Sequence, residues 1–264
     1  MKTNLERLHE LNVFLESSQH DELLQTEKLL EAIPRNENRT YSIASSANLL
    51  AVSCEVLQHS SRLLKNGSIG ESLHAIIEQY VVDSMRTELL RFPHRGSDGS
   101  TAFPSLDFKG LVFTQPLTFP SIHFQHLCFN DCAFRSALHL TGTTSENTIE
   151  FSNCSFAQEH EFLVRMTSFP KPEPPSSWRP SMSFKNCSIQ YLHVFRAELF
   201  LFFTDSTIGG MSLELSPGST VQYVNCQVTD GIVHAIDEQR TSNGYSGHQL
   251  VPKDWYKNRG WTLN

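Results

Sequence analysis

The sequence predicts an α+β protein in which a helical N-terminal part is followed by a β-solenoid of about six coils. Amphipathic helical patterns fill residues 1–95, and a short motif then returns about every twenty residues between 103 and 237. Within that second region phenylalanines recur every five residues, a period that fits neither a helix face nor a simple strand. A repeat near twenty residues indicates one structural unit stacked on itself.

Four amphipathic helices are expected in the first part of the chain. The second helix closes before Pro34, the third covers residues 45–65 and stops at Asn66-Gly67, and the fourth begins with a capping box over 68–71. Short links between the helices favour a small helical bundle. The apolar positions that define the four helices are Leu5, Leu8, Leu11 and Leu15; Leu23, Leu24, Leu29, Leu30 and Ile33; Leu49, Val52, Val56, Leu57, Leu63 and Leu64; and Leu73, Ile76, Ile77, Tyr80, Val81, Met85 and Leu89.

Residues 93–102, rich in Gly and Ser, are expected to form a linker or a first turn, and the solenoid begins at Phe103. Each copy of its motif has an apolar residue, an aromatic two positions later, then Asn or Asp, Cys or Ser, and a closing apolar residue. Successive aromatics are 21, 22, 33, 19 and 20 residues apart. The aromatics are Phe129, Phe151, Phe184, Phe203 and Tyr223, and Phe108 marks a weaker first copy.

The five-residue period predicts the shape of each coil. Four sides of five residues, each with one large apolar side chain pointing inward, make a turn of twenty. Stacked turns would form parallel strands about 4.8 Å apart, hydrogen-bonded to the coils above and below. The phenylalanines with this spacing are Phe103, Phe108 and Phe113, and then Phe119, Phe124, Phe129 and Phe134.

This pattern resembles the pentapeptide-repeat family of right-handed quadrilateral β-helices. That family places a small residue two positions before each central apolar residue, and the resemblance extends over about half of the chain. Bulky residues occupy several of the small positions, so a less regular right-handed β-helix, as in some bacterial effectors and polysaccharide-acting enzymes, is the alternative. The matching pairs are Cys132 with Phe134, Cys154 with Phe156, Cys187 with Ile189, Ser206 with Ile208 and Cys226 with Val228.

Four of the six cysteines share one position of the repeat, which predicts an inward ladder of reduced, buried thiols in a reducing compartment. A metal site is disfavoured, because the sequence has no CxxC pair. Asp131 and Asp205 share the preceding position with Asn153, Asn186 and Asn225, and they are expected to satisfy backbone groups at coil corners.

Two segments outside the ladder are candidate contact sites for a protein partner. Residues 169–180 account for the long 33-residue spacing, contain five prolines and should loop out of the solenoid. Trp178 beside Arg179 in this insertion is typical of an interface anchor. The tail over 238–264 carries Trp255 and Trp261, which could cap the last coil or bind elsewhere.

Composition narrows the function. The net charge of −7 argues against a basic nucleic-acid surface, and no apolar stretch is long enough for a membrane span. Glu6 and Glu10 interrupt the first apolar pattern, so no signal peptide is expected. The protein is therefore expected to be cytoplasmic, or delivered from a bacterial cytoplasm without a cleaved signal peptide.

Three classes of function are compatible with these observations. The sequence assigns no catalytic residue, cofactor or metal in any of them. The favoured class is a non-catalytic module that binds a protein partner. Mimicry of DNA, which the family resemblance implies, is disfavoured because residues 103–237 hold 12 acidic but also 7 basic side chains. The alternatives are a bacterial effector or a phage- or defence-related binding protein, and a carbohydrate-active β-helix enzyme.

Overall fold

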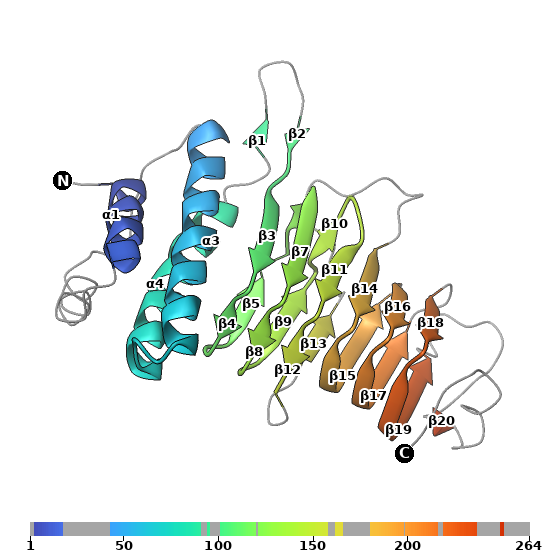
Figure 1. Cartoon of the computed structure of the whole chain (residues 1–264). Helices are drawn as coiled ribbons and strands as arrows, with labels where there is room; N and C mark the ends of the chain where they lie inside the picture. Colours follow the sequence, from blue (N-terminus) through green and yellow to red (C-terminus); the bar gives the residue numbers. More distant parts are fainter. Residues whose placement is uncertain are drawn as a thin grey trace.

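The computed structural model describes residues 3–17, 43–90, 94–95, 101–119, 121–157, 162–165, 180–197, 199–215, 219–236 and 249–250. Helices stand at one end of a stack of parallel strands, and the last coil forms the other end (Figure 1). The expected combination of helices with a β-solenoid is confirmed.

Three helices are described, α1 (Asn4–Ser17), α3 (Ile43–Lys65) and α4 (Glu71–Leu89). Most of the predicted apolar positions are buried, and α1 packs on α3, which packs on α4. The helix expected over 23–33 lies outside the described residues. A capping box that the sequence reading missed starts α1, because Glu6 N–H donates to Thr3 Oγ1 and Thr3 N–H donates to Glu6 Oε2.

The capping box predicted for α4 is wrong. Gly70 is the N-cap residue, and no side chain caps the helix. Ser68 belongs instead to the turn that ends α3, where its N–H donates to the carbonyl of Leu63 at 2.9 Å. Gly67 lies in the left-handed region with a φ of 72°, which confirms the predicted stop at Asn66-Gly67.

Helices α3 and α4 meet along a seam of small and polar residues. Ser46 Oγ donates to the Glu88 carboxylate, and Ser60 Oγ lies 2.7 Å from His74 Nδ1, so the two helices run antiparallel. The same register brings Ser53, midway between the two serines, opposite Val81. All of these side chains are buried.

Two long parallel sheets form the principal faces of the solenoid. The first contains β3 (Ser105–Lys109), β7 (His126–Asn130), β11 (Ile149–Ser152), β14 (Ser181–Lys185), β16 (Phe200–Thr204) and β18 (Thr220–Val224). The second contains β4 (Val112–Phe113), β8 (Ala133–Phe134), β12 (Ser155–Phe156), β15 (Ser188–Ala197), β17 (Thr207–Leu215) and β19 (Gln227–Ile236), with β20 (Gln249–Leu250) antiparallel at its edge.

The remaining sides exist as separate strands only near the helices. The third face has β5 (Leu117–Phe119), β9 (Leu138–Thr141) and β13 (Phe162–Arg165), and the fourth has β6 (His123–Phe124) and β10 (Thr144–Ser145). From β15 onward the second and third faces merge into one long strand per pass. Among the described residues, four short sides are therefore formed only in the first two passes.

The expected number of coils is corrected. The chain crosses the first sheet six times, but about four turns of solenoid are formed. The merged strands approach closely at Gly209, beside a register irregularity between Ile208 and Gly210, and a Cβ there would lie only 2.3 Å from the Gln190 carbonyl oxygen. Glycine at this position removes a steric clash that any other residue would introduce.

The predicted aromatic ladder fills the core. Phe151 pairs in register with Phe129 and Phe184, at ring-centroid distances of 4.8 and 4.9 Å. The long 33-residue spacing therefore leaves the ladder unbroken, as the predicted loop requires, although residues 166–179 of that insertion lie outside the described part. The apolar core continues from the solenoid into the helices.

The segment expected as a linker contains two short strands that pair with each other. β1 (His94–Arg95) pairs antiparallel with β2 (Thr101–Ala102). This pair lies just before β3, where the solenoid begins (Figure 1).

Candidate functional site

The two ends of the solenoid differ, and the N-terminal end is closed by side chains of the helices. Gln58 Nε2 and Lys65 Nζ donate to the carbonyls of Lys109 and Gly110, at 3.2 and 2.8 Å. Ser61 Oγ accepts from the Val112 N–H at 3.0 Å. These backbone groups would pair with a preceding coil if one existed, so helix α3 takes the place of that coil.

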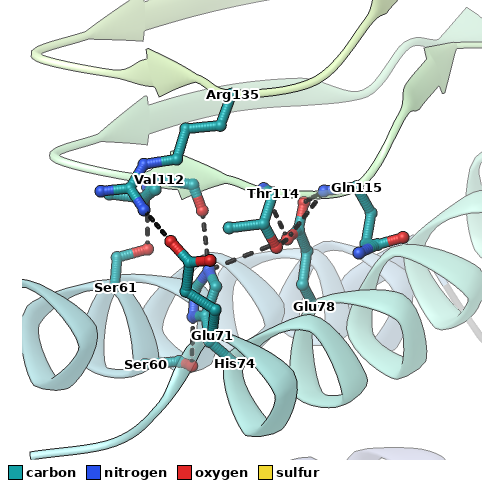
Figure 2. A network of polar contacts seen from close by, with 9 residues as sticks. All are labelled: Ser60, Ser61, Glu71, His74, Glu78, Val112, Thr114, Gln115 and Arg135. Carbon is teal, nitrogen blue, oxygen red and sulfur yellow. Dashed lines mark hydrogen bonds and ion pairs between the residues drawn. The ribbon is translucent and has the colours of Figure 1, made fainter.

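His74 lies at the centre of this junction (Figure 2). Its Nε2 is 2.8 Å from the Val112 carbonyl oxygen and its Nδ1 is 2.7 Å from Ser60 Oγ. A carbonyl only accepts, so Nε2 must carry the proton and Nδ1 must accept from the serine hydroxyl. The side chain is fully buried, and this burial lowers the pKa of His74, which favours the neutral ring.

Glu78, one helical turn further along α4, binds the next stretch of the first coil. Its carboxylate accepts from the Thr114 N–H at 2.8 Å, from Thr114 Oγ1 at 2.7 Å and from the Gln115 N–H at 3.3 Å. Burial raises the pKa of Glu78, and the hydrogen bonds from Thr114 and Gln115 oppose that rise. At the rim of the junction, Arg135 pairs with Glu71 where both side chains are exposed (Figure 2).

Ser60, His74 and Glu78 have the residue types of a hydrolytic triad, but their geometry indicates a structural role. All three are buried, so a substrate cannot reach the Ser60 hydroxyl. The Nε2 proton of His74 is committed to a backbone carbonyl, and Glu78 is committed to Thr114 and Gln115. The arrangement fixes the helices on the first coil.

A small apolar cavity lies beside this junction, between the helices and the first coil. Its volume is about 20 Å³, and Leu57, Met85, Leu89, Phe108 and Phe119 are among the residues that line it. This volume is close to that of one water-sized sphere. The cavity is therefore too small for a substrate or a cofactor.

The corner residues form the expected turns, but among the described residues no bond from their side chains to a backbone group is found, which corrects that part of the expectation. Asp131, Asn153, Asn186, Asp205 and Asn225 all adopt the left-handed conformation, with φ between 51° and 55°. Their side chains also bond to one another: Asn153 Nδ2 donates to Asp131 Oδ1 at 3.0 Å, and Asn225 Nδ2 donates to Asp205 Oδ1 at 3.2 Å. Asn and Asp tolerate this conformation better than other non-glycine residues.

The predicted thiol ladder is buried, and its cysteines are free. Each member donates to the carbonyl two residues before it, as Cys154 Sγ does to Ser152 O at 3.4 Å. Most also donate to the carbonyl of the aromatic in the preceding coil, as Cys187 Sγ does to Phe151 O and Ser206 Oγ does to Phe184 O. The position needs a small donor, which explains why serine replaces cysteine once.

None of the four predicted contact residues belongs to the described part of the chain. Trp178, Arg179, Trp255 and Trp261 lie outside the described residues. In the described ranges no group of three or more His, Cys, Asp or Glu side chains is arranged to hold a metal ion. None of the described helices is long and apolar enough to cross a membrane.

Among the described residues, β18 is less buried than the strands that precede it in the first sheet. Val221 and Tyr223 of β18 occupy the inward positions that are fully buried in the preceding coil, yet both are only half-buried. Val224, at the end of the same strand, is 54% exposed, and Gln222 is exposed. The fading of the repeat after residue 233 did not predict this exposure of β18.

Comparisons of this chain with protein-family models, with curated proteins and with solved structures found no match.

Proposed function

We propose that this chain is a non-catalytic protein-interaction module, built on a right-handed, pentapeptide-repeat-like solenoid and working in the cytoplasm. One observation carries the proposal: among the described residues, the first coil is covered by a buried polar junction with the helices, whereas β18 in the last coil has an exposed apolar side chain, Val224, at 54%. Exposed apolar side chains on an edge strand mark a contact surface. The buried free thiols agree with a reducing compartment.

Ser60, His74 and Glu78 are all buried, which supports a binding role over a catalytic one. Ser60 and His74 are enclosed, and the neighbouring cavity has room for about one water. Asp131 and Asp205, the carboxylates that a glycosidase would have to use, are corner residues with two coils between them. Trp178 and Arg179 of the insertion, with Trp255 and Trp261 of the tail, are proposed as additional partner contacts.

The test uses the full chain as bait in an extract of its native host, followed by affinity measurements with each purified partner. Val224→Lys introduces a charge on the exposed side of β18, and Thr207→Lys introduces the same charge on an exposed site of the second face. Loss of about tenfold or more in affinity is expected for the first variant alone, because burying an unpaired charge at an interface is costly. Equal binding by both variants would remove this side of β18 as the contact surface.

The insertion is tested separately. Replacement of residues 169–179 by a short Gly/Ser link is expected to preserve thermal unfolding, because β11 and β14 pair in register and Pro180, whose carbonyl accepts from the Phe200 N–H at 3.0 Å, is kept. Weaker partner binding would assign a contact to Trp178 or Arg179. Unfolding of the variant would mean that the segment supports the core.

A further inference from the structure

Strand β16 is apolar on both of its sides. Its sequence is Phe-Leu-Phe-Phe-Thr, in which Leu201 and Phe203 point into the core and are buried. Phe202 lies between them, points outward and is half-buried. A parallel strand that is apolar on both sides is typical of one that is covered on both sides. We therefore expect a partner on the outer side of β16.

The repeat does not require an aromatic at the position of Phe202. The outer side of the sheet faces away from the core, so packing inside the solenoid does not explain this side chain. The other five strands of the first sheet place small, polar or charged residues in the same row. These residues are Asp107, Cys128, Glu150, Ser183 and Gln222.

Two further side chains adjoin Phe202 on the outer face. Val224 of β18 is 54% exposed, and Lys185 of β14 is exposed. They share the next row of the sheet, because Thr204 pairs in register with Lys185 on one side and with Val224 on the other. Two strand spacings separate them, which is about 10 Å. We call Phe202, Val224 and Lys185 the β16 patch.

The charge of the β16 patch selects the chemistry of its partner. Lys185 forms no ion pair among the described residues. Two carboxylates lie in the same region, but Asp205 accepts from Asn225 Nδ2 at 3.2 Å, and Glu150 is on β11, one strand further from β16. An ammonium group beside an aromatic and an aliphatic side chain is complementary to an apolar side chain that lies next to a carboxylate.

We propose that the β16 patch binds a segment of another protein in which a large apolar side chain lies close to an aspartate or a glutamate. The apolar side chain packs on Phe202 and Val224, and the carboxylate pairs with Lys185. Ser183 and Gln222, on either side of Phe202, donate hydrogen bonds to the backbone of the segment. This inference rests on the proposed function and names the chemistry of the partner.

The experiment selects binders from a phage-displayed library of random short peptides, with the full chain as the immobilised target. Wild type is expected to enrich peptides in which Leu, Phe or Trp lies within about three positions of Asp or Glu, because an extended segment spans about 10 Å in that length. The enriched peptides are then synthesised, and calorimetry measures their affinity for wild type and for each variant.

Three variants test the roles of the side chains. Lys185→Glu should weaken binding about tenfold or more, because the carboxylate of the peptide then meets a like charge. A new selection on this variant should enrich Lys or Arg in place of Asp or Glu. Phe202→Ala should also weaken binding about tenfold or more, since aromatic anchors contribute much of the affinity of an interface. Lys109→Glu makes the same charge reversal on β3, at the other end of the sheet, and should change neither the affinity nor the selected sequences.

Several results would overturn this inference. They are a selection that enriches no peptide, enrichment of basic instead of acidic residues by wild type, and equal effects of Lys185→Glu and Lys109→Glu. A wild-type dimer in solution that Phe202→Ala dissociates would assign the β16 patch to a second copy, which also contradicts the inference. A native partner that Val224→Lys loses but Lys185→Glu still binds normally would overturn this inference alone and leave the proposed function intact.

Discussion

The imidazole Nε2 of His74 lies 2.8 Å from the carbonyl oxygen of Val112, so a helix side chain completes the backbone pairing of the first coil. The same ring binds Ser60 of the neighbouring helix through Nδ1. One neutral histidine therefore connects α3, α4 and β4. This arrangement explains how a solenoid can start without an open edge at its N-terminal end.

His74→Ala should lower the free energy of unfolding by about 2–5 kcal/mol. Two buried groups, the Val112 carbonyl and the Ser60 hydroxyl, would lose a partner, and each such loss costs about 1–3 kcal/mol. Chemical denaturation at neutral pH measures the change. His9→Ala removes an exposed histidine from α1 and should change stability by less than about 0.5 kcal/mol. Similar small losses for both variants would contradict the role assigned to His74.

The stability deficit of His74→Ala should also depend on pH. Burial lowers the pKa of His74, so the unfolded chain takes up a proton below about pH 6.5 that the folded protein resists. The stability contributed by His74 is therefore present above that pH and falls as the pH drops toward the folded pKa. Burial raises the pKa of Glu78, which has the opposite effect in the acidic range, because the folded state then takes up the proton more readily. The gap between wild type and His74→Ala should narrow on going from about pH 7.5 to about pH 5.5.

How far the sequence predicts this molecule can be judged from particular residues. The aromatics Phe129, Phe151 and Phe184 stack as the twenty-residue repeat predicts, because every coil needs the same inward side chain. The left-handed corners at Asp131 and Asn153 follow from the same regularity. Periodic features are visible in one sequence because each coil repeats the same physical requirement.

The junction at His74 has no such regularity. Its contacts between the helices and the solenoid join residues 36 to 64 positions apart in the chain and occur once. One sequence signal was available. His74 and Glu78 fall on the apolar face of α4, and serines recur every seven residues along the neighbouring helix α3. The merging of faces at β15 was also missed, since the five-residue period fades there and the close approach of β15 and β17 at Gly209 is a single contact that does not repeat.

Two serines of α3 should respond in opposite directions to loss of the hydroxyl. Ser53 Oγ is buried without a hydrogen-bond partner among the described residues, so Ser53→Ala should raise the free energy of unfolding by about 1 kcal/mol. Ser60→Ala should lower it by about 1–3 kcal/mol, because His74 Nδ1 then loses its donor. Denaturant midpoints at unchanged slope give both values. Destabilisation by both variants would indicate that the Ser53 hydroxyl has a partner in solution.

At the corner positions, substitution by glycine should leave the protein more stable than substitution by alanine. Asn153 has a φ of 55°, a conformation that costs a residue with a Cβ about 1–2 kcal/mol, so Asn153→Ala should be less stable than Asn153→Gly. Thermal unfolding of the two variants measures the order. Ser152, the preceding residue, belongs to strand β11, where Ala should instead be more stable than Gly by about 0.5–1 kcal/mol. The same order at both positions would mean that the corner conformation is not maintained.

The aromatic ladder supplies the last prediction, which concerns how stability is shared between coils. Phe151 is fully buried between Phe129 and Phe184, so Phe151→Ala should lower the free energy of unfolding by about 3–5 kcal/mol. Since each coil is supported only by its neighbours, the loss should spread along the stack. The thiols of Cys154 and Cys187, in the same and the next coil, are buried and report that spread without a new probe.

In wild type these thiols should react with a thiol reagent only after unfolding, whereas in Phe151→Ala both should label much faster without denaturant. Phe202→Ala provides the matched control, because the Phe202 ring projects from the outer side of β16 and is half-exposed. It should cost about 1 kcal/mol or less and leave labelling slow. Rapid labelling of wild type would place the ladder at the surface, and a loss below about 1 kcal/mol in Phe151→Ala would show that the ring is not packed in the core. Accelerated labelling confined to Cys154 would instead mean that the coils open one at a time.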